Sequence, residues 1–213
     1  MLQSSHEECD TDLSACCNDD CEWDMSQCAP ECLIISEYLE GGGNDRAFEL
    51  YNCGASYLRL TDLNVCVVRD SSTSCSSNAP LAQEVLREGE TLTVCDPRSV
   101  LPGLAGACDI PNADVASFDG NDRLMLWVDV DGDGVFTDED VIVDALGVVD
   151  LPPADDDAWR LKLFSRCDPT PFGGEGPYDI LDYFRLIEDF EVGPRVVDPV
   201  AGFGRAPRPG CVD

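Results

Sequence analysis

Short runs of apolar and β-branched residues, separated by turn-forming residues, recur along the chain from position 33 onward. Helices of this length would be marginal, whereas short runs that alternate apolar and polar residues are typical of strands. Gly, Pro, Asn and Ser punctuate the stretches between them, as turns require. Regularly spaced short strands predict an all-β fold, a β-sandwich. The predicted strands are 33–39, 47–51, 57–60, 65–69, 91–94, 124–128 and 141–146.

The hydrophobic pattern leaves two segments open. Residues 81–88 fit either a helical turn or another strand. In 179–191 the apolar spacing fits one face of a short helix, although a strand is also compatible with it. The residues that follow, 195–213, are rich in proline and are expected to be extended, with 196–200 able to pair along a sheet edge.

Between the predicted strands 124–128 and 141–146 lies a twelve-residue acidic segment, 129–140, that has the pattern of a calcium-binding loop. Calcium takes roughly six to eight oxygen ligands, and alternate residues of a tight turn direct their oxygens at one point. Gly134 at the sixth position permits the sharp turn, and a water beneath Thr137 would serve the ninth. The predicted ligands are the carboxylates of Asp129, Asp131 and Asp133, the backbone carbonyl of Val135, and the carboxylate of Asp140.

The context of this loop bears on its role. Asp140 stands where such loops usually carry Glu, so we expect weaker or different coordination at the last position. Because predicted strands flank the loop, binding would stabilise a hairpin rather than open a pair of helices, which favours structural over signalling calcium. The alternative is an acidic, solvated turn. The acids at 155–157 are a candidate for a second, weaker calcium site.

The charge balance is strongly acidic, with a formal net charge of −30 and a single lysine, Lys162. This excludes a general nucleic-acid binder, because phosphate recognition needs Lys and Arg. Between Asp119 and Asp157 there are thirteen acids and one base, Arg123. Such density repels itself unless divalent cations or salt neutralise it, although most of these acids are expected to form a solvated face.

The chain contains 13 cysteines and one histidine, His6. Because no C-x-x-C pair is present, disulfides formed in an oxidising compartment are favoured over zinc. The odd number leaves at least one thiol free or bonded to another chain. We expect a mature secreted chain, since the sequence shows neither a signal peptide nor an apolar run long enough to span a membrane.

Residues 1–32 form a cysteine-rich segment that holds Trp23 but almost no aliphatic residues. Such a segment cannot build a core, so disulfides must hold it. Its six cysteines permit three internal bridges, in about fifteen pairings among which the sequence does not choose. The segment is either a docking or cross-linking arm, or a stapled cap on the main domain. Its cysteines are Cys9, Cys16, Cys17, Cys21, Cys28 and Cys32.

Catalytic groups are scarce in this sequence. With His6 as the lone histidine, neither a Ser-His-Asp nor a Cys-His arrangement is expected. The glycines at 41–43 lack the lysine and the helix of a phosphate-binding loop. Adjacent acids in so acidic a protein usually face solvent, so no pair of carboxylates is assigned to glycoside hydrolysis. The sequence therefore predicts a protein without enzymatic activity.

Several separated motifs stand out along the chain: 35–41 (ISEYLEG), Asn44, 47–52 (AFELYN), 118–124 (FDGNDRL), 141–147 (VIVDALG) and Trp159. The first three resemble the opening of bacterial lamin-tail domains, and the last three resemble the later strands of that family. The resemblance covers about residues 33–165 and implies an immunoglobulin-like β-sandwich. It implies an accessory or binding module of a secreted protein rather than a particular chemistry. The calcium loop and the cysteines depart from the family's pattern.

Together these features divide the chain into a cysteine-rich segment (1–32), a β-sandwich (33–192) with its loop 129–140, and an extended Pro-rich tail (193–213). We expect a secreted or cell-surface structural protein, a building block of an extracellular filament or surface layer that self-associates through its terminal arms. The alternative is a monomeric binding or adhesion module that recruits a glycan, a surface or a partner enzyme.

Overall fold

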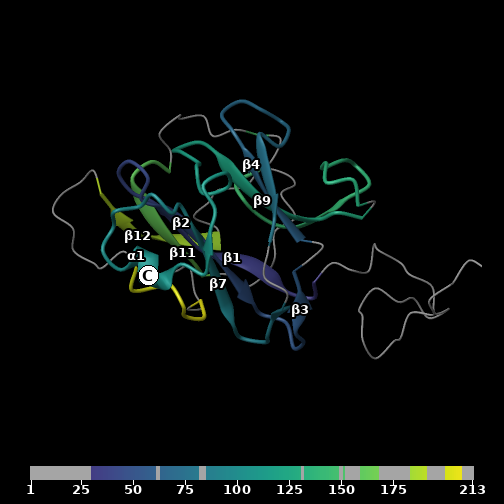
Figure 1. Ribbon diagram of the computed structural model, residues 1–213, viewed down its shortest axis with the longest axis horizontal. Helices are drawn as coiled ribbons and strands as arrows, with labels where there is room; N and C mark the ends of the chain where they lie inside the picture. Colours follow the sequence, from purple (N-terminus) through teal and green to yellow (C-terminus); the bar gives the residue numbers. More distant parts are fainter. Residues whose placement is uncertain are drawn as a thin grey trace, which may run out of the picture.

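The computed structural model describes residues 30–60, 63–81, 85–130, 132–148, 151, 159–167, 183–190 and 200–207. Within these ranges the regular elements are strands apart from one four-residue helix, and no helix is long and apolar enough to cross a membrane (Figure 1). The elements are β1 (Leu33–Glu40), β2 (Arg46–Asn52), β3 (Leu58–Arg59), β4 (Leu63–Val68), β5 (Ser77–Pro80), β6 (Val85–Leu86), β7 (Thr91–Cys95), α1 (Leu104–Ala107), β8 (Ile110–Pro111), β9 (Arg123–Val128), β10 (Val141–Leu146), β11 (Lys162–Arg166) and β12 (Phe184–Asp189).

The strands form two main sheets that pack against each other (Figure 1). The larger sheet has six strands in the order β12-β11-β1-β2-β7-β8, and the smaller has four in the order β10-β9-β4-β5. The pairs are antiparallel apart from β7 with β8, which is parallel. The strands β3 and β6 make a separate two-stranded sheet. The all-β sandwich predicted from the sequence is therefore confirmed.

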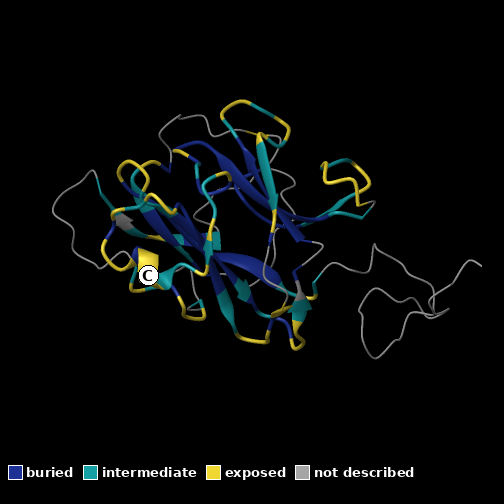
Figure 2. Cartoon of the chain, viewed as in Figure 1, coloured by how far each residue is buried: buried dark blue, intermediate teal, exposed yellow. Residues whose placement is uncertain are grey.

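The main hydrophobic core lies between the two sheets, and a second cluster covers the outer face of the larger sheet. Neighbouring residues of β1 take part in both, because successive side chains of a strand point to opposite faces. Tyr38 belongs to the inner core, where its ring lies 4.8 Å from that of Phe118, whereas Leu39 belongs to the outer cluster. All eight residues of β1 are consequently buried (Figure 2).

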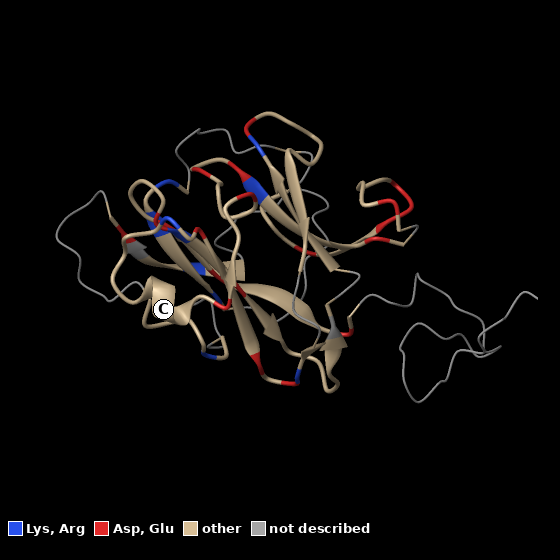
Figure 3. Ribbon diagram, viewed as in Figure 1, with Lys and Arg blue, Asp and Glu red and all other residues tan. Residues whose placement is uncertain are grey.

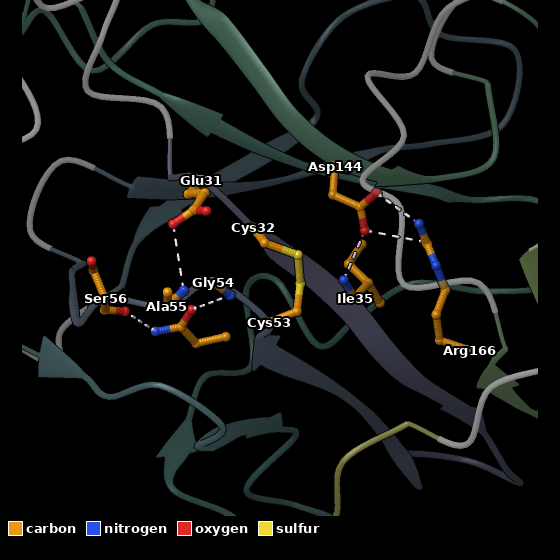
Figure 4. Close-up of a disulfide and its surroundings, with 10 residues drawn as sticks. Glu31, Cys32, Ile35, Cys53, Gly54, Ala55, Ser56, Asp144 and Arg166 are labelled. Atoms are coloured by element: carbon orange, nitrogen blue, oxygen red, sulfur yellow. Dashed lines mark hydrogen bonds and ion pairs between the residues drawn. A yellow bond between two sulfur atoms is a disulfide. The ribbon is translucent and has the colours of Figure 1, made fainter.

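A buried ion pair joins the two sheets. Arg166 on β11 donates two hydrogen bonds of 3.3 Å to the carboxylate of Asp144 on β10, and both side chains are 0% exposed. The backbone N–H of Ile35 on β1 donates to the same carboxylate at 2.7 Å (Figure 4). The pairing register shifts beside both contacts, between Ile35 and Glu37 and between Ile142 and Asp144. These bulges re-aim side chains locally.

Three disulfides have both cysteines within the described part of the chain: Cys32–Cys53, Cys66–Cys75 and Cys95–Cys108. Cys167 is disulfide-bonded as well. Residues 32 and 53 flank the paired ends of β1 and β2, because Leu33 is the register partner of Asn52, and this brings the two cysteines together (Figure 4). Cys32 therefore bonds outside the cysteine-rich segment, so the three internal bridges that its six cysteines would permit do not all form. The other cysteines of that segment lie outside the described residues.

The predicted strands all coincide with strands of the structure, although 57–60 shrinks to the two residues of β3. In 81–88 the described part contains the strand β6, and 82–84 lie outside the described residues. Of 179–191 the structure describes 183–190, and there the strand alternative is confirmed, because β12 pairs with β11 over Phe184–Asp189; 179–182 and 191 lie outside the described residues. Of the tail, 196–199 and Cys211 lie outside the described residues, as do 155–157.

Candidate metal centre

The predicted calcium loop connects two paired strands. Val128 at the end of β9 is the register partner of Val141 at the start of β10, so 129–140 forms the loop of a hairpin. The strand–loop–strand arrangement expected from the sequence is present, and the loop projects from the small sheet with its acidic positions gathered along it (Figure 3). Because both strands are fixed in a buried sheet, the base of the loop is held in place.

Asp129, at the first loop position, organises the first half of the loop. Its two carboxylate oxygens accept hydrogen bonds from the backbone N–H groups of Gly132, at 2.8 Å, and Gly134, at 2.9 Å. Both glycines have positive φ, 74° and 73°, a conformation that residues with a Cβ adopt only at a cost. The sequence pattern is thus realised as a loop that curls around the carboxylate of Asp129.

Asp140, at the twelfth position, organises the second half. One of its oxygens accepts the backbone N–H of Val130 at 3.0 Å, and the other accepts the backbone N–H of Thr137 at 2.7 Å. The hydroxyl of Thr137 lies 3.3 Å from the same carboxylate. Asp140 therefore bonds to both halves of the loop, and its carboxylate lies on the loop's inner side rather than in open solvent.

Contacts with the small sheet brace the outer part of the loop. The ring of Phe136 packs edge-on against Trp127 of β9, at 5.5 Å between centroids. Asn78 of β5 donates from Nδ2 to the carbonyl of Gly134 at 3.0 Å and accepts from Nε1 of Trp127 at 3.3 Å. These contacts restrict the loop conformation before any ion binds, which lowers the entropy that an ion would have to overcome.

The remaining predicted ligands are Asp131, Asp133 and Val135. Asp133 accepts the backbone N–H of Val135 at 2.7 Å, and Val135 is 59% exposed. Asp131 lies outside the described residues. The described loop carboxylates are not among groups of three acids whose oxygens lie within 4.8 Å of one another. An ion held at about 2.3–2.6 Å needs its ligand oxygens in such proximity, so the described carboxylates alone do not form a completed site.

Within the described ranges, the one group of acids that meets this distance is Asp70, Asp119 and Asp122, whose oxygens lie within 4.8 Å of one another and could hold a metal ion. Asp122 is buried, while the other two are exposed. Its oxygens accept the backbone N–H of Asp70 at 2.9 Å and that of Asp119 at 3.0 Å. Burial raises the pKa of Asp122, and the charges of Asp119 and Asp70 raise it further, against the two N–H donors.

The sequence analysis missed this cluster because its members come from two distant turns. Asp70 lies in the β4–β5 turn, which the Cys66–Cys75 disulfide closes, and Asp119 and Asp122 lie in the turn before β9. Arg123 connects the two turns by donating to the carbonyls of Asp70 and Ser72. The motif 118–124 was visible in the sequence, but nothing local pointed to Asp70.

Oxygen-only groups of this kind suit hard cations such as Ca²⁺ and Mg²⁺ rather than thiolate-seeking metals. No family model matches the chain, and no curated protein or solved structure is similar to it. The resemblance to lamin-tail domains therefore stays a prediction, and the functional argument depends on the chain's own residues.

Proposed function

We propose that the protein is a secreted, non-enzymatic structural module whose β-sandwich is stabilised by disulfides and by Ca²⁺ bound in the loop 129–140, and that it serves as a building block of an extracellular assembly. The observation that carries the calcium part is the pair of carboxylates, Asp129 and Asp140, at the two ends of one braced hairpin loop. Asp129 already accepts backbone N–H groups of the first half of the loop, and Asp140 accepts backbone N–H groups of both halves.

Calcium suits this loop for a physical reason. The N–H donors leave further lone pairs on both carboxylates, since each oxygen accepts one or two hydrogen bonds and a carboxylate has about four acceptor sites. An ion would also relieve the repulsion among the loop's acids. Because β9 and β10 are locked in register, the energy of binding would stabilise the folded hairpin rather than drive a rearrangement.

The disulfides support an extracellular location. Three intramolecular disulfides, including Cys66–Cys75 across a single hairpin, form and persist in oxidising surroundings. The 13 cysteines of the chain are an odd number, so at least one is available for a bond to another chain or remains a thiol. This count is what favours an assembly.

The alternative, a monomeric extracellular binding module, is favoured by a different observation. The described part of the C-terminal tail, 200–207, packs on its own chain, with Phe203 buried among residues of the larger sheet. A segment already seated in this way is not a free arm. Light scattering after size exclusion separates the two functions: a large mass in Ca²⁺ supports the building block, and a 23.1 kDa monomer supports the module.

The calcium proposal is tested by thermal unfolding of the oxidised full chain in Ca²⁺ and in chelator. At a calcium concentration of about 100 times Kd, binding stabilises by about 2.7 kcal/mol, which corresponds to a rise of about 5–10 °C in Tm for a domain of this size. Asp129→Asn and Asp140→Asn should each remove most of this rise, because each loses a charged ligand.

Asp119→Asn and Asp70→Asn are the matched controls, because they neutralise acids of the other cluster and leave the loop intact. If the loop binds calcium, these variants keep the calcium-dependent rise. If only the Asp119→Asn variant lost the calcium-dependent rise in Tm, the stabilising calcium site would be the cluster of Asp70, Asp119 and Asp122. An unchanged Tm in chelator for the unaltered protein would refute calcium stabilisation at either place.

A further inference from the structure

The C-terminal segment 200–207 lies as a strap over the outer face of the six-stranded sheet, beside α1 (Figure 1). Phe203 is 7% exposed and packs into the outer hydrophobic cluster with Leu39, Ala47 and Leu163. Val200 packs closely over Gly103, where an added Cβ would lie 2.7 Å from its side chain. The strap is therefore held at two points by apolar contacts.

Between these apolar contacts the strap covers two acids. Glu37 on β1 and Glu49 on β2 are register partners, so their side chains lie next to each other on the outer face. They are 7% and 0% exposed. The backbone N–H of Gly204 donates to Oε2 of Glu49, and a Cβ added to Gly202 would lie 2.5 Å from Oε1 of Glu37. The strap backbone thus rests directly on both carboxyl groups, and glycines permit that approach.

Few charges surround this pair. The hydroxyl of Ser36 donates to Oε1 of Glu49 at 2.7 Å, and the side chain of Ser165 on β11 hydrogen-bonds Glu37. Arg185 on β12 attracts the charge of Glu37, whereas Asp109, just before β8, repels that of Glu49. The neighbouring position on β7 is the neutral Thr93. Arg205, the charged residue of the strap, is exposed. Two like charges on Glu37 and Glu49 would therefore face each other with little water.

Burial dominates the titration of both groups. Burial raises the pKa of Glu37 to about 8. The hydrogen bond to Ser165 and the charge of Arg185 lower this pKa, and the charge of Glu49 raises it further. Burial likewise raises the pKa of Glu49 to about 7, against the donors Gly204 and Ser36 and with the repulsion of Asp109. Lifting the strap would return water to both carboxyl groups and relax both values toward 4.5.

We propose that 200–207 is a pH-sensitive strap, docked on β1 and β2 while Glu37 and Glu49 are protonated and released when they ionise. Because both groups titrate higher in the docked state than in water, docking is strongest below pH about 4.5 and weakens as the pH rises through about 7 and about 8. Release would expose the apolar surface formed by Leu39, Ala47 and Leu163.

The test is amide hydrogen exchange of the oxidised full chain, followed over 200–207 at about pH 5 and about pH 9 and corrected for intrinsic exchange. Protection of the strap should fall by at least about tenfold at the higher pH, the factor that one pKa unit of coupling produces, while β4 and β9 keep their protection. In the double variant Glu37→Gln/Glu49→Gln the protection factors of the strap at about pH 5 and about pH 9 should agree within about threefold, because the neutral amides do not ionise.

Two further variants keep the outcome interpretable if the double variant folds poorly. Gly202→Ala should remove strap protection already at about pH 5, because its Cβ would clash with Glu37, whereas Gly42→Ala, which meets nothing within 4 Å, should leave it unchanged. Strap protection that does not change with pH in the unaltered chain would overturn the proposal. So would an equal loss in the double glutamine variant, or full protection in Gly202→Ala.

Discussion

Removing the carboxylate of Asp144 is the sharpest test of what holds the two sheets together. This group accepts two hydrogen bonds from Arg166 of the larger sheet and a third from the backbone of Ile35, all within a region that solvent does not reach. Asp144→Ala deletes the acceptor for all three donors. Asp144→Asn keeps an oxygen for Ile35 but removes the negative charge.

The expected loss follows from burial. Breaking a buried ion pair by removing one partner costs about 3–5 kcal/mol, because the remaining charge has lost its counter-charge in a place without water. The rings of Tyr183 and Phe184 lie 5.2 and 4.9 Å from the Arg166 guanidinium and stabilise that cation in part. We expect Asp144→Ala to destabilise by about 4 kcal/mol, and Asp144→Asn by about 1–3 kcal/mol less because the Ile35 N–H keeps a partner.

Equilibrium unfolding in urea, with the disulfides intact, measures these losses. With an m-value of about 2–3 kcal/mol per molar, the midpoint of Asp144→Ala should fall by roughly 1.3–2 M. The matched control is Glu90→Gln, which breaks the exposed Arg87–Glu90 pair and should leave the midpoint unchanged within error. The double variant Asp144→Leu/Arg166→Met should recover part of the loss, since no charge is then left buried although the Ile35 N–H still lacks its acceptor. If Asp144→Ala matched the control, the ion pair would not be what joins the sheets.

Two other substitutions test the packing and the buried acids. Gly147→Ala should destabilise by about 2–5 kcal/mol in urea unfolding, because Gly147 has a φ of 84° and a Cβ there would lie 2.4 Å from Trp159. The control Gly43→Ala, with a φ of 69° and nothing within 4 Å, should destabilise by only about 1–2 kcal/mol. Equal losses in the two variants would contradict the clash with Trp159. The stability of the unaltered chain should fall between pH about 4.5 and about 8, because burial raises the folded pKa of Glu37 to about 8 while the unfolded group titrates at 4.5. Glu37→Gln should make this fall smaller. Parallel curves of stability against pH for the two proteins would show that ionisation of Glu37 does not destabilise the fold.

The strands could be predicted from the sequence where their side chains follow a local pattern. β9 and β10 are short runs rich in bulky or β-branched residues beside an obvious turn, and both were predicted. In β12 the apolar residues fit the periods of both a helix and a strand, and pairing with β11, which the sequence does not show, decided the outcome. Ser77–Pro80 has no apolar run at all and is a strand because β4 and the Cys66–Cys75 bridge hold it there.

The same distinction explains the candidate sites. The loop 129–140 is contiguous, so its spacing alone suggests an ion. The cluster of Asp70 with Asp119 and Asp122 depends on a contact across 52 positions, and the strap over Glu37 on one across more than 160 positions. In both of these cases single acids that look like ordinary surface residues in the sequence become buried or grouped only through the order of strands in the sheets.

The loop 129–140 and the cluster of Asp70, Asp119 and Asp122 lie at opposite ends of the strand β9, so two concentrations of negative charge flank one strand of the small sheet. Asp122 directly precedes β9 and Asp129 directly follows it, and six residues of extended strand separate them by about 20 Å. A cation at the first end would join the β4–β5 turn to the start of β9, and an ion in the loop would join the end of β9 to β10. Either ion would therefore close one end of the small sheet. We therefore expect calcium, if it binds at either end, to slow exchange of the β9 terminal amides more than that of the amides at its centre.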